Sequence, residues 1–143
     1  MKKNHLTLAV MACAVLAGSA GARDPGHAAN KAGAVVTGNF SHAIPNIPGK
    51  SLIAAEVVYP PGVQSRPHHH AHSAFIYGYV VSGSIRSQVD GEPERILTAG
   101  QSFFEVPGAH HRVSGNASKT EPAKFLAVFV VDTEDKQLTT PDE

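Results

Sequence analysis

The residues of this chain best suited to chemistry are four histidines within a five-residue segment. His68, His69, His70 and His72 lie in the segment RPHHHAHSAFIYGYVVSG, residues 66–83. On a β-strand, residues i and i+2 point to the same face and lie roughly 7 Å apart. His68 and His70 would therefore share one face, with His69 on the other. Two imidazoles at this spacing form half of a metal site, so a further ligand must come from another strand.

A second pair of histidines, His110 and His111, follows the turn formed by residues 106–108. Because a turn passes the chain to the next strand, one of these residues can return to the first pair. A His-rich tract by itself can equally be a polar surface loop. Two separated clusters are what a folded metal site requires. Imidazole suits zinc, copper, iron and nickel alike, so the histidines do not identify the metal.

The N-terminus has the features of a secretory signal peptide. Lys2 and Lys3 precede an apolar run, and small residues end the segment at Ala22. We therefore expect residues 1–22 to be a signal peptide and the protein to be secreted or periplasmic. A lipoprotein signal ending at Cys13 is the less favoured alternative, because Met11 fits that motif poorly.

The processed chain would carry no cysteine and close to balanced charge. Cys13 is the single cysteine of the 143-residue sequence, so a metal site must use His, Asp or Glu. Of the 12 basic residues, Lys2 and Lys3 leave with the signal, against 12 acidic residues, giving a net charge of −2. This composition argues against a nucleic-acid partner. Without a second apolar span, we also expect no membrane association after signal cleavage.

The remaining sequence is typical of an all-β protein of one domain. Short runs rich in β-branched and aromatic residues alternate with Gly and Pro turns, and no convincing helix follows Val35. Such a pattern indicates a sandwich or barrel. We expect a disordered lead-in at 23–34, the folded domain at 35–132 and a polar tail at 133–143. The predicted strands cover residues 52–59, 74–82, 85–89, 95–97, 102–106, 111–114 and 125–131.

Two segments resemble the paired motifs of the cupin superfamily. PPGVQSRPHHH, residues 60–70, matches the first motif, with five residues between Gly62 and His68. GQSFFEVPGAHH, residues 100–111, matches the second, although Val106 stands where proline is usual. The resemblance implies a small single-domain cupin, with a double-stranded β-helix or jelly-roll barrel that encloses a metal.

The resemblance implies His68, His70 and His111 as ligands of one divalent transition metal: Fe, Mn, Zn, Ni or Cu. Cupins commonly place a glutamate four residues after the second histidine, where this chain has Ala74. Three arrangements remain open: a three-histidine site, which we favour, a site completed by Glu105, or one completed by His72. The strand after Ala74 is also longer than usual, and Gly78 is a candidate bulge.

The implied function is metal-dependent chemistry on a small molecule. Cupins with His-rich sites include dioxygenases that cleave β-diketones, flavonols and hydroxylated aromatic acids, so a dioxygenase is our first expectation. The alternatives are a non-catalytic metal- or ligand-binding cupin and a metal-free structural jelly roll. Five aromatic residues on the strands flanking the motifs are candidates for lining an apolar pocket, although packing in the core is the favoured alternative for each: Phe75, Tyr77, Tyr79, Phe103 and Phe104. One of the two tyrosines is a candidate donor to a substrate oxygen.

Two further features bear on recognition. Arg66 and Arg86 are candidates for holding a substrate carboxylate at the mouth of the pocket. The apolar run 125–131 and the β-rich N-terminal segment favour a homodimer, as small cupins often pair sheets across subunits.

Overall fold

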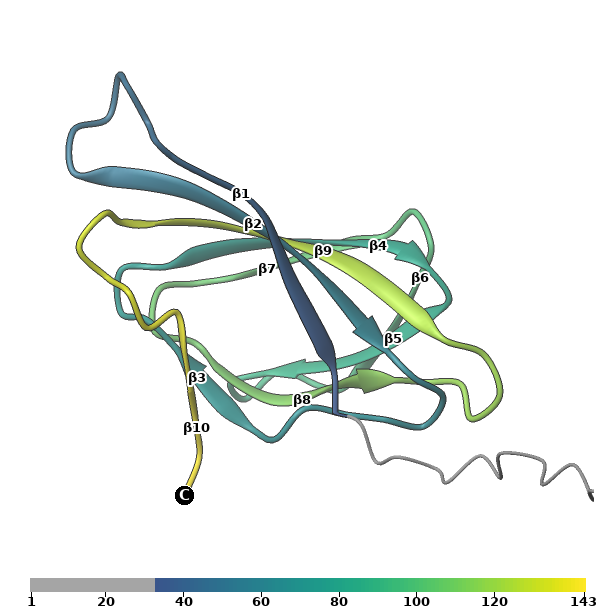
Figure 1. Cartoon of the computed structure of the whole chain (residues 1–143). Coiled ribbons are helices and arrows are strands. Elements are labelled where there is room, and N and C mark those ends of the chain that lie inside the picture. The colour runs from purple at the N-terminus through teal and green to yellow at the C-terminus, as the bar shows by residue number, and fades with distance from the viewer. Residues whose placement is uncertain (1–32) are drawn as a thin grey trace, which may run out of the picture.

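The computed structural model describes residues 33–143, which form ten β-strands and, within that range, no helix. The expected signal peptide and nearly all of the expected lead-in lie outside the described residues. The strands form two antiparallel sheets that face each other across a common interior (Figure 1). The all-β jelly-roll expectation is therefore confirmed. No helix among these residues is long and apolar enough to cross a membrane.

Each sheet contains five strands that are far from consecutive in the chain. In order across the first sheet, these are β1 (Val35–Ala43), β2 (Lys50–Tyr59), β9 (Ala123–Asp132), β4 (Phe75–Ser82) and β7 (Ser102–Glu105). In order across the second sheet, they are β10 (Thr139–Pro141), β3 (His68–His70), β8 (His110–Asn116), β5 (Ser84–Val89) and β6 (Arg95–Thr98). Successive strands cross repeatedly between the sheets, which brings both histidine clusters into the second sheet.

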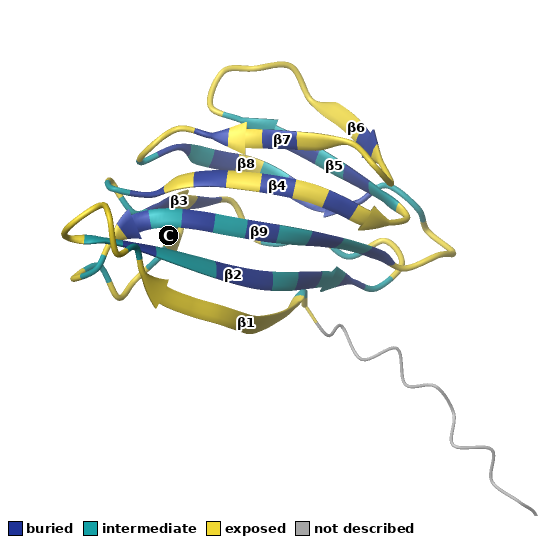
Figure 2. Cartoon of the chain, turned by 90° about the horizontal axis from the view of Figure 1, so that it is seen from above, coloured by how far each residue is buried: buried dark blue, intermediate teal, exposed yellow. Residues whose placement is uncertain are grey.

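Three strands lie outside the predicted ranges: β1, β10 and the short β3, which the histidine spacing assumed without giving it bounds. β1 is an edge strand that pairs with β2 along its length, and all of its residues are exposed (Figure 2). β10 forms inside the segment expected to be a polar tail and pairs with β3, Thr140 opposite His69. β10 has only three residues, and the apolar residues of β1 do not alternate with polar ones, so neither sequence shows the two-residue repeat of a strand.

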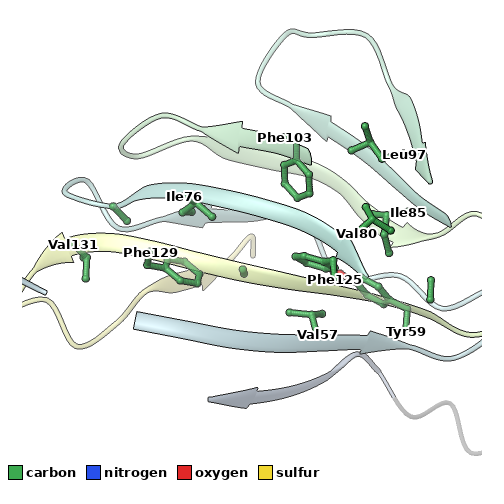
Figure 3. Close-up of a cluster of buried hydrophobic side chains, with 13 residues drawn as sticks. Val57, Tyr59, Ile76, Val80, Ile85, Leu97, Phe103, Phe125, Phe129 and Val131 are labelled. Atoms are coloured by element: carbon green, nitrogen blue, oxygen red, sulfur yellow. The ribbon is translucent and has the colours of Figure 1, made fainter. Parts of the chain in front are cut away.

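The core lies between the sheets and follows the two-residue repeat of the strands. β9 is flanked by β2 and β4, and its alternate residues Phe125, Phe129 and Val131 are buried. Figure 3 shows these side chains meeting Ile76 and Val80 of β4 in the interior. The apolar run that includes these residues is thus explained by a central strand whose opposite face is only partly covered.

Gly78 is not a bulge, contrary to the expectation. It pairs regularly with Ala127 and with Phe103, and the irregularity between β4 and β9 lies between Val80 and Ser82. The reason for glycine is steric. A Cβ atom at position 78 would lie 2.3 Å from ring atoms of Phe103, so the ring of Phe103 occupies the space that a side chain would need.

Candidate metal centre

The pairing of β3 with β8 determines which histidines meet. His68 lies opposite His111 and His69 opposite His110 in the antiparallel register. Because alternate residues of a strand face opposite sides, His68, His70 and His111 point into the barrel. They are 9%, 8% and 2% exposed, respectively. The partner strand expected to complete the first pair is therefore β8.

The three inward rings present nitrogen atoms to a common space. One ligating atom from each of His68, His70 and His111 lies within 4.8 Å of the others. Nδ1 of His68 donates to the carbonyl of Arg66 at 2.8 Å, and Nδ1 of His70 donates to the carbonyl of Leu138 at 3.2 Å. Since a carbonyl only accepts, Nδ1 is the donor in both rings, which makes Nε2 the nitrogen available to a metal. Backbone contacts of this kind orient metal-binding imidazoles.

Glu105 reaches the same space from the opposite sheet. It is the last residue of β7 and is only 3% exposed. Its Oε1 lies 3.2 Å from Nδ1 of His111, and its Oε2 lies 3.1 Å from Nε2 of His70. Burial alone would raise the pKa of Glu105, but the contacts with His111 and His70 outweigh it and lower the pKa to about 2. The side chain is therefore an ionised carboxylate.

Two buried atoms of this group lack a hydrogen-bond partner. They are Nε2 of His70 and Oε2 of Glu105, which are close together but not aligned as donor and acceptor. Buried polar atoms are normally satisfied, and exceptions need an explanation. A cation between them would supply it, because an imidazole lone pair and a carboxylate oxygen are both ligating atoms. The residues present thus fit a divalent transition metal.

The structure also places the other candidate residues. His72 is exposed in the turn after β3, near Gly108, and lies outside the inner group. Ala74 is fully buried and offers no ligating atom. His110 lies on the outer face of the second sheet. Among the alternatives for a fourth ligand, the fold brings Glu105 to the three histidines and leaves His72 outside.

The inner histidines and Glu105 form one wall of a cavity of about 240 Å³. The opposite walls are mainly apolar, which suits a small molecule with an apolar body. Tyr59 adds a polar group: its hydroxyl lies 2.7 Å from Oγ of Ser65 and 2.9 Å from Oγ of Ser114. The apolar lining comes chiefly from Val57, Ile76, Phe125, Ala127 and Phe129.

The expected aromatic lining is largely wrong. Phe75, Tyr77, Tyr79 and Phe104 are 38–62% exposed and lie on the outer face of the first sheet. Only Phe103 faces inward, where it packs in the core. The error is one of strand parity, because β4 points its even-numbered residues inward. The tyrosine that does face the cavity is Tyr59, the last residue of β2. It points inward because alternate residues of this part of β2 do so.

Burial also sets the ionisation of two cavity residues. Desolvation is the largest influence on both His68 and Tyr59. It lowers the pKa of His68, which favours the neutral imidazole that a metal requires. It raises the pKa of Tyr59, which therefore remains a neutral phenol. Of the two arginines considered, Arg66 lines the cavity, whereas Arg86 pairs with Glu94 at the surface.

Comparisons with known proteins agree with this architecture. An uncharacterized conserved protein with a double-stranded β-helix domain from Klebsiella pneumoniae is similar at 18% identity and a TM-score of 0.58, covering 78% of this chain and 86% of that one. Oxalate oxidase in complex with a substrate analogue, glycolate, is 25% identical with a TM-score of 0.55, covering 71% and 54% of the two chains. The DMSP lyase DddQ from Ruegeria pomeroyi is 26% identical with a TM-score of 0.53, covering 64% and 45%.

The present chain thus spans about half the length of those two enzymes. No curated protein sequence matches it significantly. A family model described as a cupin domain matches residues 55–129, slightly more than half of the chain. That match covers both histidine clusters and the strands between them, and we conclude that the chain belongs to the cupin-domain family.

Proposed function

We propose that this cupin is a metal-dependent enzyme acting on a small molecule, with one divalent transition metal held by His68, His70, His111 and Glu105. The observation that carries the proposal is the convergence of these four side chains on one wall of an apolar cavity. On a six-coordinate metal such as Fe(II), these four ligands would leave two positions open, and open positions are typical of catalytic sites. The cavity provides room for a substrate beside those positions.

The chemistry of the cavity favours a substrate with an apolar body and oxygen donors at one end. A bound metal would supply Lewis acidity and positions at which a chelating oxygen pair is held. The apolar walls exclude water, and the Tyr59 hydroxyl offers a hydrogen bond to a second polar group. We therefore propose an oxygen-consuming reaction of dioxygenase type on a β-diketone or phenolic compound. The similarity to oxalate oxidase and a DMSP lyase supports small-molecule chemistry on this fold.

Oxygen consumption tests this proposal. The untagged protein is loaded with Fe(II) without air and then mixed with oxygenated buffer and a panel of β-diketones and catechols. We expect oxygen uptake with at least one compound, and its loss in Glu105→Gln and His70→Ala. His72→Ala is the matched control, since His72 lies outside the inner group. Tight metal binding without oxygen uptake across the panel would instead support a non-catalytic metal-binding cupin.

We also propose that residues 1–22 direct export and are then removed. The support is the sequence pattern described above, and the residues concerned lie outside the described structure. Mass spectrometry of the protein recovered from a periplasmic extract should give an N-terminus at Arg23. An intact N-terminus on cytoplasmic protein would contradict export.

We further propose a homodimer through the outer face of the first sheet. An antiparallel sheet facing water normally carries polar residues on that face, yet Tyr77 here lies between Val128 and Phe104 on neighbouring strands. The ring of Phe104 also stacks on Phe75, with ring centroids 6.0 Å apart. An identical apolar face on a second copy would cover these side chains through a two-fold contact.

Sedimentation of the wild-type protein and of the double variant Tyr77→Ser, Phe104→Ser tests the dimer. We expect a dimer for the wild type and a folded monomer for the variant. A wild-type monomer at all accessible concentrations would rule out this contact.

A further inference from the structure

A second group of ligating side chains lies on the outer face of the sheet that carries the inner histidines. We propose that His69, His110 and Asp142 form an external binding site for a zinc-type divalent cation. The same strand register that turns His68, His70 and His111 inward turns His69 and His110 outward. The two groups are thus built back to back on β3 and β8.

The three side chains of the external group lie close enough together to bind one ion. The rings of His69 and His110 are stacked, with centroids 4.1 Å apart and an interplanar angle of 14°. Nε2 of His110 lies 2.8 Å from Oδ2 of Asp142, and Nε2 of His69 lies 3.8 Å from Oδ1. One ligating atom of each residue lies within 4.8 Å of the other two. Both imidazoles therefore direct their Nε2 atoms at the carboxylate of Asp142.

Asp142 is held at this point by its backbone. Its N–H donates to the carbonyl of Pro67 at 2.9 Å, and its own carbonyl accepts from Nη2 of Arg66 at 3.0 Å. On the other side, the backbone N–H of His110 donates to Oδ1 of Asp90 at 2.9 Å. Hydrogen bonds thus fix the backbones of Asp142 and His110, which limits the conformational entropy lost when a cation binds.

The donor set fits zinc. Two imidazole nitrogens and one carboxylate oxygen are common zinc ligands, with bond lengths of about 2.0–2.2 Å and a tetrahedral arrangement. Ligating atoms around such an ion are about 3.4 Å apart, by the geometry of a tetrahedron of that bond length. The two nitrogen–oxygen contacts, 2.8 and 3.8 Å, bracket this separation. The stacked rings would have to turn toward each other to direct both nitrogens at the ion. Water would occupy the fourth position.

Such an ion would act on the inner site through β10. Asp142 directly follows this strand, whereas His69 and His110 belong to β3 and β8, so the ion would tie β10 to its neighbours. Thr139 and Pro141 line the inner cavity. The carbonyl of Leu138, just before β10, accepts the hydrogen bond that orients His70. The external ion would therefore brace the strand that closes one side of the cavity.

Titration of the metal-free, untagged protein with Zn²⁺ tests the proposal, using calorimetry to count sites. We expect two ions per wild-type chain, and one in His69→Ala and in Asp142→Asn, each losing external affinity by at least about tenfold. Asn at 142 preserves a hydrogen bond to His110, so the fold should be retained. His42→Ala, an exposed histidine on β1, is the matched control and should still bind two ions.

A second measurement follows the tail itself. Zn²⁺ should slow hydrogen exchange in the peptide spanning residues 138–143 of the wild type, with no slowing in Asp142→Asn. His70→Ala should lose only the inner ion. If the wild type binds a single ion that His69→Ala abolishes, the external site stands and the inner proposal fails. Unchanged zinc stoichiometry and affinity in both His69→Ala and Asp142→Asn would overturn the external site and leave Asp142 as a hydrogen-bonding anchor.

Discussion

Nε2 of His70 lies 3.1 Å from Oε2 of Glu105, and neither atom has a hydrogen-bond partner although both are buried. The two residues come from different sheets, β3 in the second and β7 in the first. Closure of the barrel therefore creates a nitrogen–oxygen pair that each sheet alone lacks. A cation between these two atoms would satisfy both of them, which supports the proposed inner metal site.

Removal of an inner histidine should remove the inner metal. His70→Ala and His111→Ala each delete one of four ligands, so we expect affinity for the inner ion to fall by well over about tenfold while the fold persists. Elemental analysis after dialysis measures the loss. His72→Ala should keep wild-type content. Unchanged metal content in both His70→Ala and His111→Ala would show that the inner group does not bind it.

Glu105→Gln should change how the stability of the metal-free protein depends on pH. The pKa of Glu105 is about 2 in the folded protein, below its usual 4.5. The folded state therefore binds fewer protons than the unfolded state between these values. The stabilising contribution is complete above pH 4.5 and is lost as the pH falls toward 2.

Urea unfolding from neutral pH down to about pH 3 measures this effect. The wild type should exceed Glu105→Gln by on the order of 3 kcal/mol near neutrality, and the difference should shrink in acid. A difference that stays constant with pH would contradict an ionised, histidine-paired carboxylate.

Tyr59→Phe should weaken the contact between the two sheets without affecting the metal. Tyr59 belongs to β2, and its hydroxyl contacts Ser114 of β8 across the interior. Loss of that buried hydroxyl should lower the free energy of unfolding by about 1 kcal/mol. Equilibrium denaturation gives this value, and metal content should match the wild type. Metal loss in this variant would indicate that Tyr59 supports the ligands directly.

Gly78→Ala should destabilise the protein by overpacking. The new methyl group would meet the ring of Phe103, which is itself confined by Phe125 and His111. We expect a loss of about 1–3 kcal/mol. Gly38→Ala is the control, because nothing lies within 4 Å of its added Cβ. It should change stability by less than about 0.5 kcal/mol. Equal effects of the two substitutions would contradict the steric explanation.

Much of the fold and the three histidines of the inner site could be predicted from the sequence, because both depend on the alternation of side chains along strands. The spacing of His68 and His70 indicated a shared inner face, and the turn before His111 indicated its return. The two cupin-like motifs located the barrel. These features are local, so a single sequence carries them.

The remaining features depend on pairing between distant strands. Whether Glu105 faces inward is decided by the register of β7 against β4, which no local pattern specifies. The alternation of side chains along β4 likewise puts Tyr77 and Tyr79 outside the cavity, and the alternation along β2 puts Tyr59 inside it. β10 and the external group arise because the C-terminal residues pair with β3, a contact between segments about 70 residues apart in sequence.

An anomalous difference map, recorded at a metal absorption edge from crystals of the untagged protein, tests the inner metal centre most directly. We expect a peak about 2.0–2.2 Å from Nε2 of His68 and of His70, from a nitrogen of His111 and from a carboxylate oxygen of Glu105. Crystals grown with Fe, Zn or Mn that show no peak among these four side chains would contradict the assignment.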